Sequence, residues 1–157
     1  VGFMGSTHLR PSNVLDTLAD QLGSRFQPNR TVWSDEALRQ YLEAFPLQFN
    51  MHQKQTCCPH DESEVAAMEA FRLAPLLTNK ACVISTPVAE KDKLMWEGIV
   101  HFAEVSETKQ AVESLAPQVD RCQVEAFQLF KSRFDPERLL RASGFLDTWW
   151  PPSDKSG

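Results

Sequence analysis

The chain has 157 residues, of which 42% are hydrophobic and 24% charged, and its formal net charge is -5. A chain of this size and composition can bury a core without disulfides or metal, so we expect one soluble domain over residues 1–157, with extended tails at 1–10 and 145–157. No stretch approaches the roughly 20 apolar residues of a membrane-spanning helix, and the acidic balance argues against nucleic-acid binding, which usually needs a basic face.

The first half of the chain predicts helices separated by prolines, because proline is poorly tolerated inside helices and sheets. Apolar residues repeat at helical spacing over residues 13–26. Ser34 can cap a second helix that opens with two acids and should end before Pro46. A third helix opens with the capping-box pattern of residues 61–64 and should bend or end at Pro75.

The second half continues this pattern. The short apolar run 81–86 is either a strand or a buried turn of helix, and periodicity does not separate the two. Residues 88–105 keep helical spacing, and Ser106 should cap a helix that ends near Leu115. A helix from Pro117 carries the strongest stripe, with Phe127, Phe130 and Phe134 expected to face one core. Asp135 before Pro136 is a strong helix start.

Together, these patterns predict six or seven short helices. We therefore predict an all-α fold, a bundle or orthogonal array, with at most one short strand pair near residues 81–86. The candidate helix starts are unevenly spaced, which does not support a helical repeat.

Glycine usage excludes several kinds of chemistry. The six glycines do not cluster in the body of the chain, whereas a phosphate-cradling loop needs clustered glycines. We therefore expect no nucleotide and no other cofactor. Gly-x-Ser-x-Gly, His-Glu-x-x-His and Cys-x-x-Cys motifs are also absent, so we expect that the protein is not an enzyme. An active site assembled from scattered residues is the alternative that motifs do not address.

One cluster resembles metal chemistry, since His52, Cys57, Cys58 and His60 lie within nine residues. Adjacent cysteines cannot easily point at one tetrahedral ion, and no second ligand pair follows at a familiar distance. We expect no metal here, and if one is bound these four residues are its ligands. A small metal- or thiol-dependent protein that uses the Cys57–His60 loop is the alternative function.

The other cysteines, Cys82 and Cys122, lie in apolar patterns and are expected to be buried thiols. His101 is expected to be a partly buried structural histidine. Free thiols favour a reducing, intracellular compartment, the cytoplasm or the mitochondrion. The chain begins with Val1, which suits either a cleaved targeting peptide or a cloning boundary.

The two ends of the chain carry large apolar residues, and the C-terminal tail either folds back over the helices or anchors a partner. Trp149 and Trp150 follow the last predicted helix, and tryptophan is enriched at binding hot spots. Phe3 and Met4 offer a second handle. We therefore expect a non-catalytic helical accessory subunit that docks onto a larger protein assembly.

Overall fold

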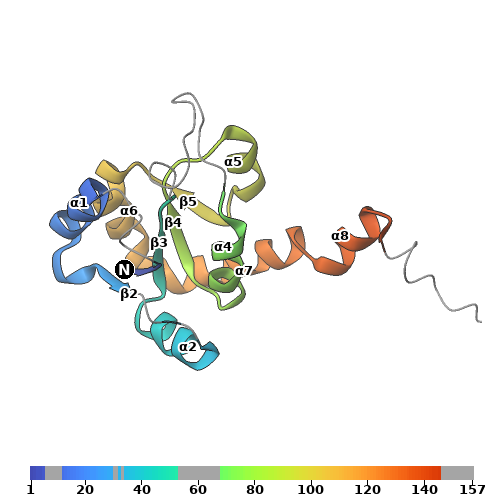
Figure 1. The fold of residues 1–157 in the computed structure, drawn as a ribbon, viewed down its shortest axis with the longest axis horizontal. Coiled ribbons are helices and arrows are strands. Elements are labelled where there is room, and N and C mark those ends of the chain that lie inside the picture. Colours follow the sequence, from blue (N-terminus) through green and yellow to red (C-terminus); the bar gives the residue numbers. More distant parts are fainter. Residues whose placement is uncertain (6–11, 30–31, 33, 53–67, 146–157) are drawn as a thin grey trace, which may run out of the picture.

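The computed structural model describes residues 1–5, 12–29, 32, 34–52 and 68–145. Within them the strands form a five-stranded, all-parallel sheet in the order β2-β1-β3-β4-β5 (Figure 1). The strands are β1 (Gly2–Met4), β2 (Gln27–Asn29), β3 (Leu47–Asn50), β4 (Cys82–Ser85) and β5 (Val100–Phe102). The prediction of an all-α bundle is therefore wrong, and the fold is a parallel α/β sheet between helices.

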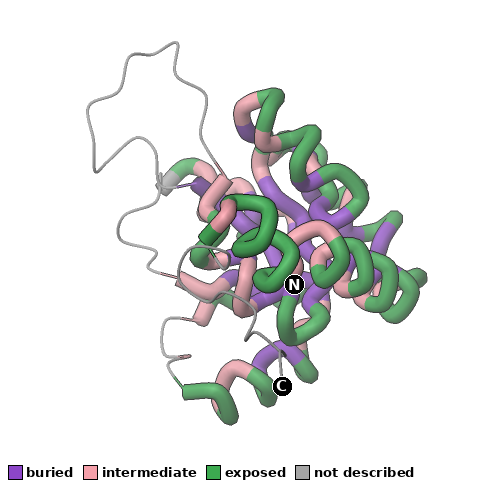
Figure 2. The backbone as a smooth tube through the Cα atoms, turned by 90° about the vertical axis from the view of Figure 1, so that its right-hand side faces the viewer, coloured by how far each residue is buried: buried purple, intermediate pink, exposed green. Residues whose placement is uncertain are grey.

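Helices cover both faces of this sheet (Figures 1 and 2). The elements are α1 (Ser12–Leu22), α2 (Asp35–Ala44), α4 (Ala70–Thr78), α5 (Glu90–Trp96), α6 (Thr108–Leu115), α7 (Val119–Arg133) and α8 (Pro136–Ala142), with 3-10 turns at Gly23–Arg25, Val105–Glu107 and Ala116–Gln118. One core cluster joins α1 and α6 to the sheet, and the other joins α2, α4 and α5. Helix α7 contributes Cys122 to the first cluster and Ala126 to the second, while α8 projects from the body. None of the described helices is both long and apolar enough to cross a membrane.

The two central strands alternate strictly between these layers, as the twofold period of a strand requires. Leu47 and Phe49 of β3 join the α1–α6 cluster, as do Cys82 and Ile84 of β4. Val83 of β4 joins the opposite cluster. All residues of both strands are buried, which is typical of parallel strands covered by helices on both faces.

Tyr41 ties α2 to the sheet through its buried hydroxyl. That oxygen accepts a hydrogen bond from the Phe3 backbone N–H at 2.9 Å and donates to the Gln27 carbonyl. Gly2 makes this approach possible, because a Cβ there would lie 2.7 Å from the Tyr41 hydroxyl and 2.2 Å from Gln48 Nε2. The side chains of α2 and β3 thus occupy the space that a larger residue at position 2 would need.

Local signals at helix ends were predicted well. Ser34 Oγ accepts from the Ala37 N–H at 3.2 Å, and Asp135 Oδ1 accepts from the Arg138 N–H at 3.1 Å, so both expected caps are confirmed. Pro75 lies inside α4 and does not end it. The capping-box pattern at residues 61–64 lies outside the described residues.

The expected helix over residues 88–105 is wrong. Helix α5 ends at Trp96, and Gly98 at φ +76° completes the turn that the Ile99 N–H closes by donating to the Trp96 carbonyl at 3.0 Å. Val100–Phe102 then forms the edge strand β5. The run 81–86, which was open to either assignment, contains the interior strand β4. Ser106 does not cap the next helix, because it lies inside the 3-10 turn Val105–Glu107 that precedes α6 and that has its own capping box of Glu104 and Glu107.

The phenylalanine stripe of α7 lines a groove of about 740 Å³ and is only half-buried. Phe134 stacks on Trp96 with ring centroids 4.6 Å apart, and Phe130 does so at 6.4 Å. Phe127 lies under the Lys80 ammonium, 5.4 Å from its ring centroid. Phe130 and Phe134 pack against the second core cluster, as expected, whereas Phe127 is not among the residues of that cluster.

Adding a methyl group at position 2 should destabilise the fold. We expect Gly2→Ala to lower the free energy of unfolding by about 1–3 kcal/mol, because Gln48 and Tyr41 must move to admit it. The measurement is urea denaturation. Gly144→Ala is the control, since it has φ +73° and nothing within 4 Å of its Cβ, and should cost about 1 kcal/mol of backbone strain. A smaller loss in Gly2→Ala than in Gly144→Ala would contradict the packing argument.

Candidate functional site

Polar side chains gather where β3 and β4 end. Asn50 is the last residue of β3 and Ser85 the last of β4, and both are fully buried. Asn50 Nδ2 donates to Ser85 Oγ at 2.9 Å, and Ser85 Oγ donates to the Thr86 carbonyl at 3.1 Å. The Ser85 hydroxyl is therefore engaged inside the fold and is not presented as a nucleophile.

An ion pair at the start of α4 holds this polar pair. Arg72 Nη1 donates to Asn50 Oδ1 at 3.3 Å and to the Met51 carbonyl at 2.9 Å. Arg72 Nη2 lies 2.6 Å from Glu69 Oε2, and the two side chains are only 11% and 17% exposed. Because both charges are largely removed from water, removing either partner would leave a costly buried charge.

Two further groups border this cluster. His52 is buried, and its Nε2 lies 3.5 Å from Ser85 Oγ. Since Ser85 already donates its proton to Thr86, the contact suits a protonated Nε2 that donates to the serine oxygen. Asp92 of α5 accepts from the Met68 N–H at 2.6 Å, which places a second carboxylate near the start of α4.

The direction in which strands are added to the sheet changes at this edge. The chain leaves β1 toward α1 on one face of the sheet, whereas it leaves the adjacent β3 toward α4 on the opposite face. In open parallel sheets, ligands bind outside the carboxyl ends of the strands at such a reversal. We refer to Asn50, His52, Glu69, Arg72 and Ser85 as the carboxyl-edge cluster.

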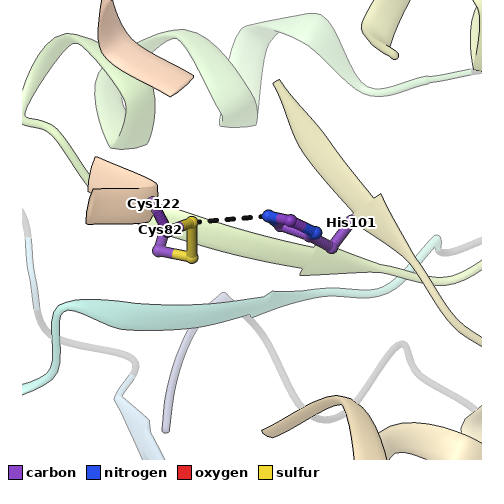
Figure 3. A group of neighbouring side chains, drawn as sticks. All are labelled: Cys82, His101 and Cys122. Carbon is purple, nitrogen blue, oxygen red and sulfur yellow. Dashed lines mark hydrogen bonds between the residues drawn. A yellow bond between two sulfur atoms is a disulfide. The ribbon is translucent and has the colours of Figure 1, made fainter. Parts of the chain in front are cut away.

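A second group of reactive side chains lies at the other end of β4 (Figure 3). Cys82 forms a disulfide with Cys122 of α7, and His101 Nε2 of β5 lies 3.5 Å from Cys122 Sγ. Burial lowers the pKa of His101 below the usual histidine value, which favours a neutral ring. Both cysteines are buried as expected, but they are bonded rather than free thiols. The expected reducing compartment rested on free thiols and stays a prediction.

The residues singled out from the sequence are scattered. His52 belongs to the carboxyl-edge cluster, while Cys57, Cys58 and His60 lie outside the described residues, as do Trp149 and Trp150. Phe3 is 0% exposed in β1, and Met4 is partly buried against the second core cluster. Phe3 therefore cannot serve as the expected exposed handle.

Sequence reasoning missed most of the carboxyl-edge cluster. Asn50, Arg72 and Ser85 are ordinary polar residues with no motif around them. One usable signal was present, because Ser85 lies at the end of the apolar run 81–86 and polar residues at strand ends often face a site. The neighbourhood of Cys82, His101 and Cys122 had no sequence signal, since the three come from distant elements.

No protein-family model, curated protein or solved structure matches this chain. The described residues therefore define a class by topology alone, a doubly wound parallel α/β domain. Such folds host many unrelated activities, so function has to be argued from the site.

The Asn50–Ser85 pair should be worth measurable stability. We expect Ser85→Ala to lower the free energy of unfolding by about 1–3 kcal/mol, because it removes a buried acceptor from Asn50 Nδ2. Ser132→Ala is the matched control, since this serine is exposed and bonds only within its own helix, and it should change stability by less than about 0.5 kcal/mol. Equal effects in chemical denaturation would show that the buried bond contributes nothing.

Proposed function

We propose that this protein binds a nucleotide-like ligand, a small molecule with hydroxyl groups at one end and phosphate at the other. The observation that carries the proposal is the largely buried carboxyl-edge cluster, which lies beside the point between β1 and β3 where the strand order reverses. Polar groups are costly to bury, and strand ends at such a reversal are where parallel α/β folds hold ligands.

The hydroxyl end would lie at the start of α4. A carboxylate accepts but does not donate, and it has about four acceptor positions, so Glu69 can accept from a ligand hydroxyl while it pairs with Arg72. Asp92 offers a second carboxylate on the neighbouring helix. The donor groups of sugar hydroxyls complement this pair of acceptors.

The phosphate end would lie at the start of α1, which follows β1 across the same edge. The first turn of this helix contains no acidic residue, so nothing there opposes the positive end of its dipole. Backbone N–H groups at such a terminus bind phosphate without a side chain. The scarcity of glycine argues only against a glycine-rich loop and not against this mode of binding.

The earlier expectations bear on this proposal in two ways. The glycine usage led us to expect no nucleotide, which is the opposite of this proposal, and a nucleotide-binding experiment decides between the two. The expectation that the chain is not an enzyme stays a prediction, since the proposal assigns binding and no reaction.

Ligand binding should depend on Glu69. We expect at least one nucleoside mono- or diphosphate to raise the melting temperature of the full chain, and Glu69→Gln to weaken its binding tenfold or more in calorimetry, about 1.4 kcal/mol. The matched control is Glu125→Gln, another ion-paired helix glutamate that is exposed and lies on α7. It should bind like the wild type.

A ligand without ribose hydroxyls completes this test. The dideoxy analogue should bind the wild type more weakly than the parent nucleotide, whereas Glu69→Gln should not distinguish the two. The proposal fails if no nucleoside or nucleotide in the panel binds, or if Glu69→Gln and Glu125→Gln behave alike.

A second candidate function is docking onto a partner protein, and the groove between α4, α5 and α7 favours it. Trp96, Phe130 and Phe134 line this groove, and Leu139 and Leu140 of the projecting α8 are 47% and 40% exposed. An apolar groove with exposed apolar residues on an adjacent helix is typical of interaction sites. Docking onto a partner requires that the groove is open in the isolated chain.

An apolar dye tests whether the groove is open. We expect the full chain to bind anilinonaphthalene sulfonate, Phe130→Asp to lose this binding, and Val124→Asp, at a 51% exposed position of the same helix, to keep it. The double variant Trp149→Ala/Trp150→Ala should change neither dye binding nor the melting temperature. If this double variant instead bound more dye and melted at a lower temperature, the C-terminal tail would be covering the groove in the wild type. The groove would then be closed in the isolated chain, which would exclude docking.

A further inference from the structure

The side chains of Cys82, His101 and Cys122 converge on one point, although they come from β4, β5 and α7 (Figure 3). Their ligand atoms, two sulfurs and one imidazole nitrogen, all lie within 4.8 Å of one another. The convergence follows from the sheet register. His101 pairs with Ile84, so both side chains share the face to which Cys82 also points.

Access to these atoms is one-sided. Cys82 is 0% exposed at the start of a central strand, and Cys122 is 7% exposed. A cavity of about 590 Å³ borders Cys122 and His101 but not Cys82, and Glu125 and Gln128 also line it. A small reagent or an ion can therefore approach from the side of the helix and the edge strand.

We propose that these residues form a redox-linked zinc site, in which Cys82 and Cys122 are bonded to each other when oxidised and bind Zn²⁺ together with His101 when reduced. Zinc prefers thiolate and imidazole ligands in a tetrahedral arrangement, at roughly 2.3 Å from sulfur and 2.0 Å from nitrogen. Two sulfurs on such an ion lie ~3.8 Å apart, so the bonded sulfurs of Cys82 and Cys122 would have to move apart when the disulfide is reduced.

The fourth position would be held by water from the cavity. Three protein ligands and an open position are the arrangement of reactive rather than structural zinc sites. The Glu125 carboxylate pairs with Arg121 at 2.7 Å, so it lines the cavity without being needed as a ligand.

The exchange between the two states balances with a dithiol and a peroxide. An added dithiol gives two electrons and two protons to the Cys82–Cys122 disulfide. The protein then carries two thiols, and the reagent is oxidised to its own disulfide. Zinc binding then releases both thiol protons to solvent. Hydrogen peroxide reverses this. The two thiolates give two electrons to its O–O bond, which breaks, while the sulfur–sulfur bond forms again and zinc leaves. The peroxide keeps its own two protons and takes up two more from solvent, so that its two oxygens become two water molecules.

The chain contains its own control for this site. Cys57 and Cys58 are the other two cysteines, and they belong to the loop that the sequence suggested for metal. Zinc bound by that loop should be lost with those cysteines, whereas zinc at the proposed site should not. Neither result depends on nucleotide binding, so this proposal and the preceding one can fail separately.

The experiment measures zinc and cobalt binding to the full chain after reduction without oxygen. We expect about one zinc per chain by elemental analysis, and a thiolate-to-cobalt charge-transfer band when Co²⁺ replaces zinc. Cys122→Ser and His101→Gln should weaken zinc tenfold or more, while Cys57→Ser/Cys58→Ser keeps it. Circular dichroism under the same reducing conditions checks folding, and His101→Gln, at an exposed position of an edge strand, serves if Cys122→Ser does not fold.

Peroxide provides the second measurement. Adding it to the zinc-loaded Cys57→Ser/Cys58→Ser protein should release zinc to a coloured chelator and remove two thiols per zinc released. The proposal is overturned if the reduced wild type binds no zinc, if binding disappears with Cys57 and Cys58, or if peroxide removes thiols without releasing the metal.

Discussion

Burial of the β3–β4 pair on both faces is the constraint on which the rest of the structure depends. The two strands match residue for residue from Leu47–Cys82 to Asn50–Ser85, and no residue of either is exposed. Apolar side chains satisfy this burial without further help, but polar ones need partners inside the fold. Asn50 and Ser85 meet that need in each other and in Arg72, which in turn requires Glu69. The polar pair at the ends of β3 and β4 is thereby linked to the residues at the start of α4.

The same constraint explains how much of the fold could be predicted. Helix caps depend on neighbouring residues, so Ser34 and Asp135 were assigned correctly from the sequence. The strands are only three or four residues long, and fully buried parallel strands lack the alternation of apolar and polar residues that identifies a half-buried strand. Gly98 was counted as a cost within a helix, whereas its left-handed conformation separates a helix from a strand.

The candidate sites escaped prediction for a different physical reason. Each is assembled from residues far apart in the chain, as when Arg72 of α4 contacts Asn50 of β3 or Cys122 of α7 bonds to Cys82 of β4. The sequence cluster His52–His60 drew attention because its members are near neighbours in the chain, but His52 Nε2 also lies 3.5 Å from Ser85 Oγ, which is distant in the sequence. Proximity in sequence is a poor guide in a parallel sheet, where adjacent strands are joined by long crossovers.

Strand β4 carries one site at each end, since Cys82 begins it and Ser85 ends it. Three residue steps in a strand span roughly 10 Å, and β4 is paired on both sides, to β3 and to β5. If the Cys82–Cys122 disulfide opens, Cys82 remains part of a strand that is hydrogen-bonded to a neighbour on each side. The other end of that strand, at Ser85, should therefore move only slightly. His101 lies on the more adjustable side, because β5 is an edge strand with a cavity beside it. Opening of the disulfide should accordingly be absorbed by α7 and β5, which leaves the carboxyl-edge cluster in place.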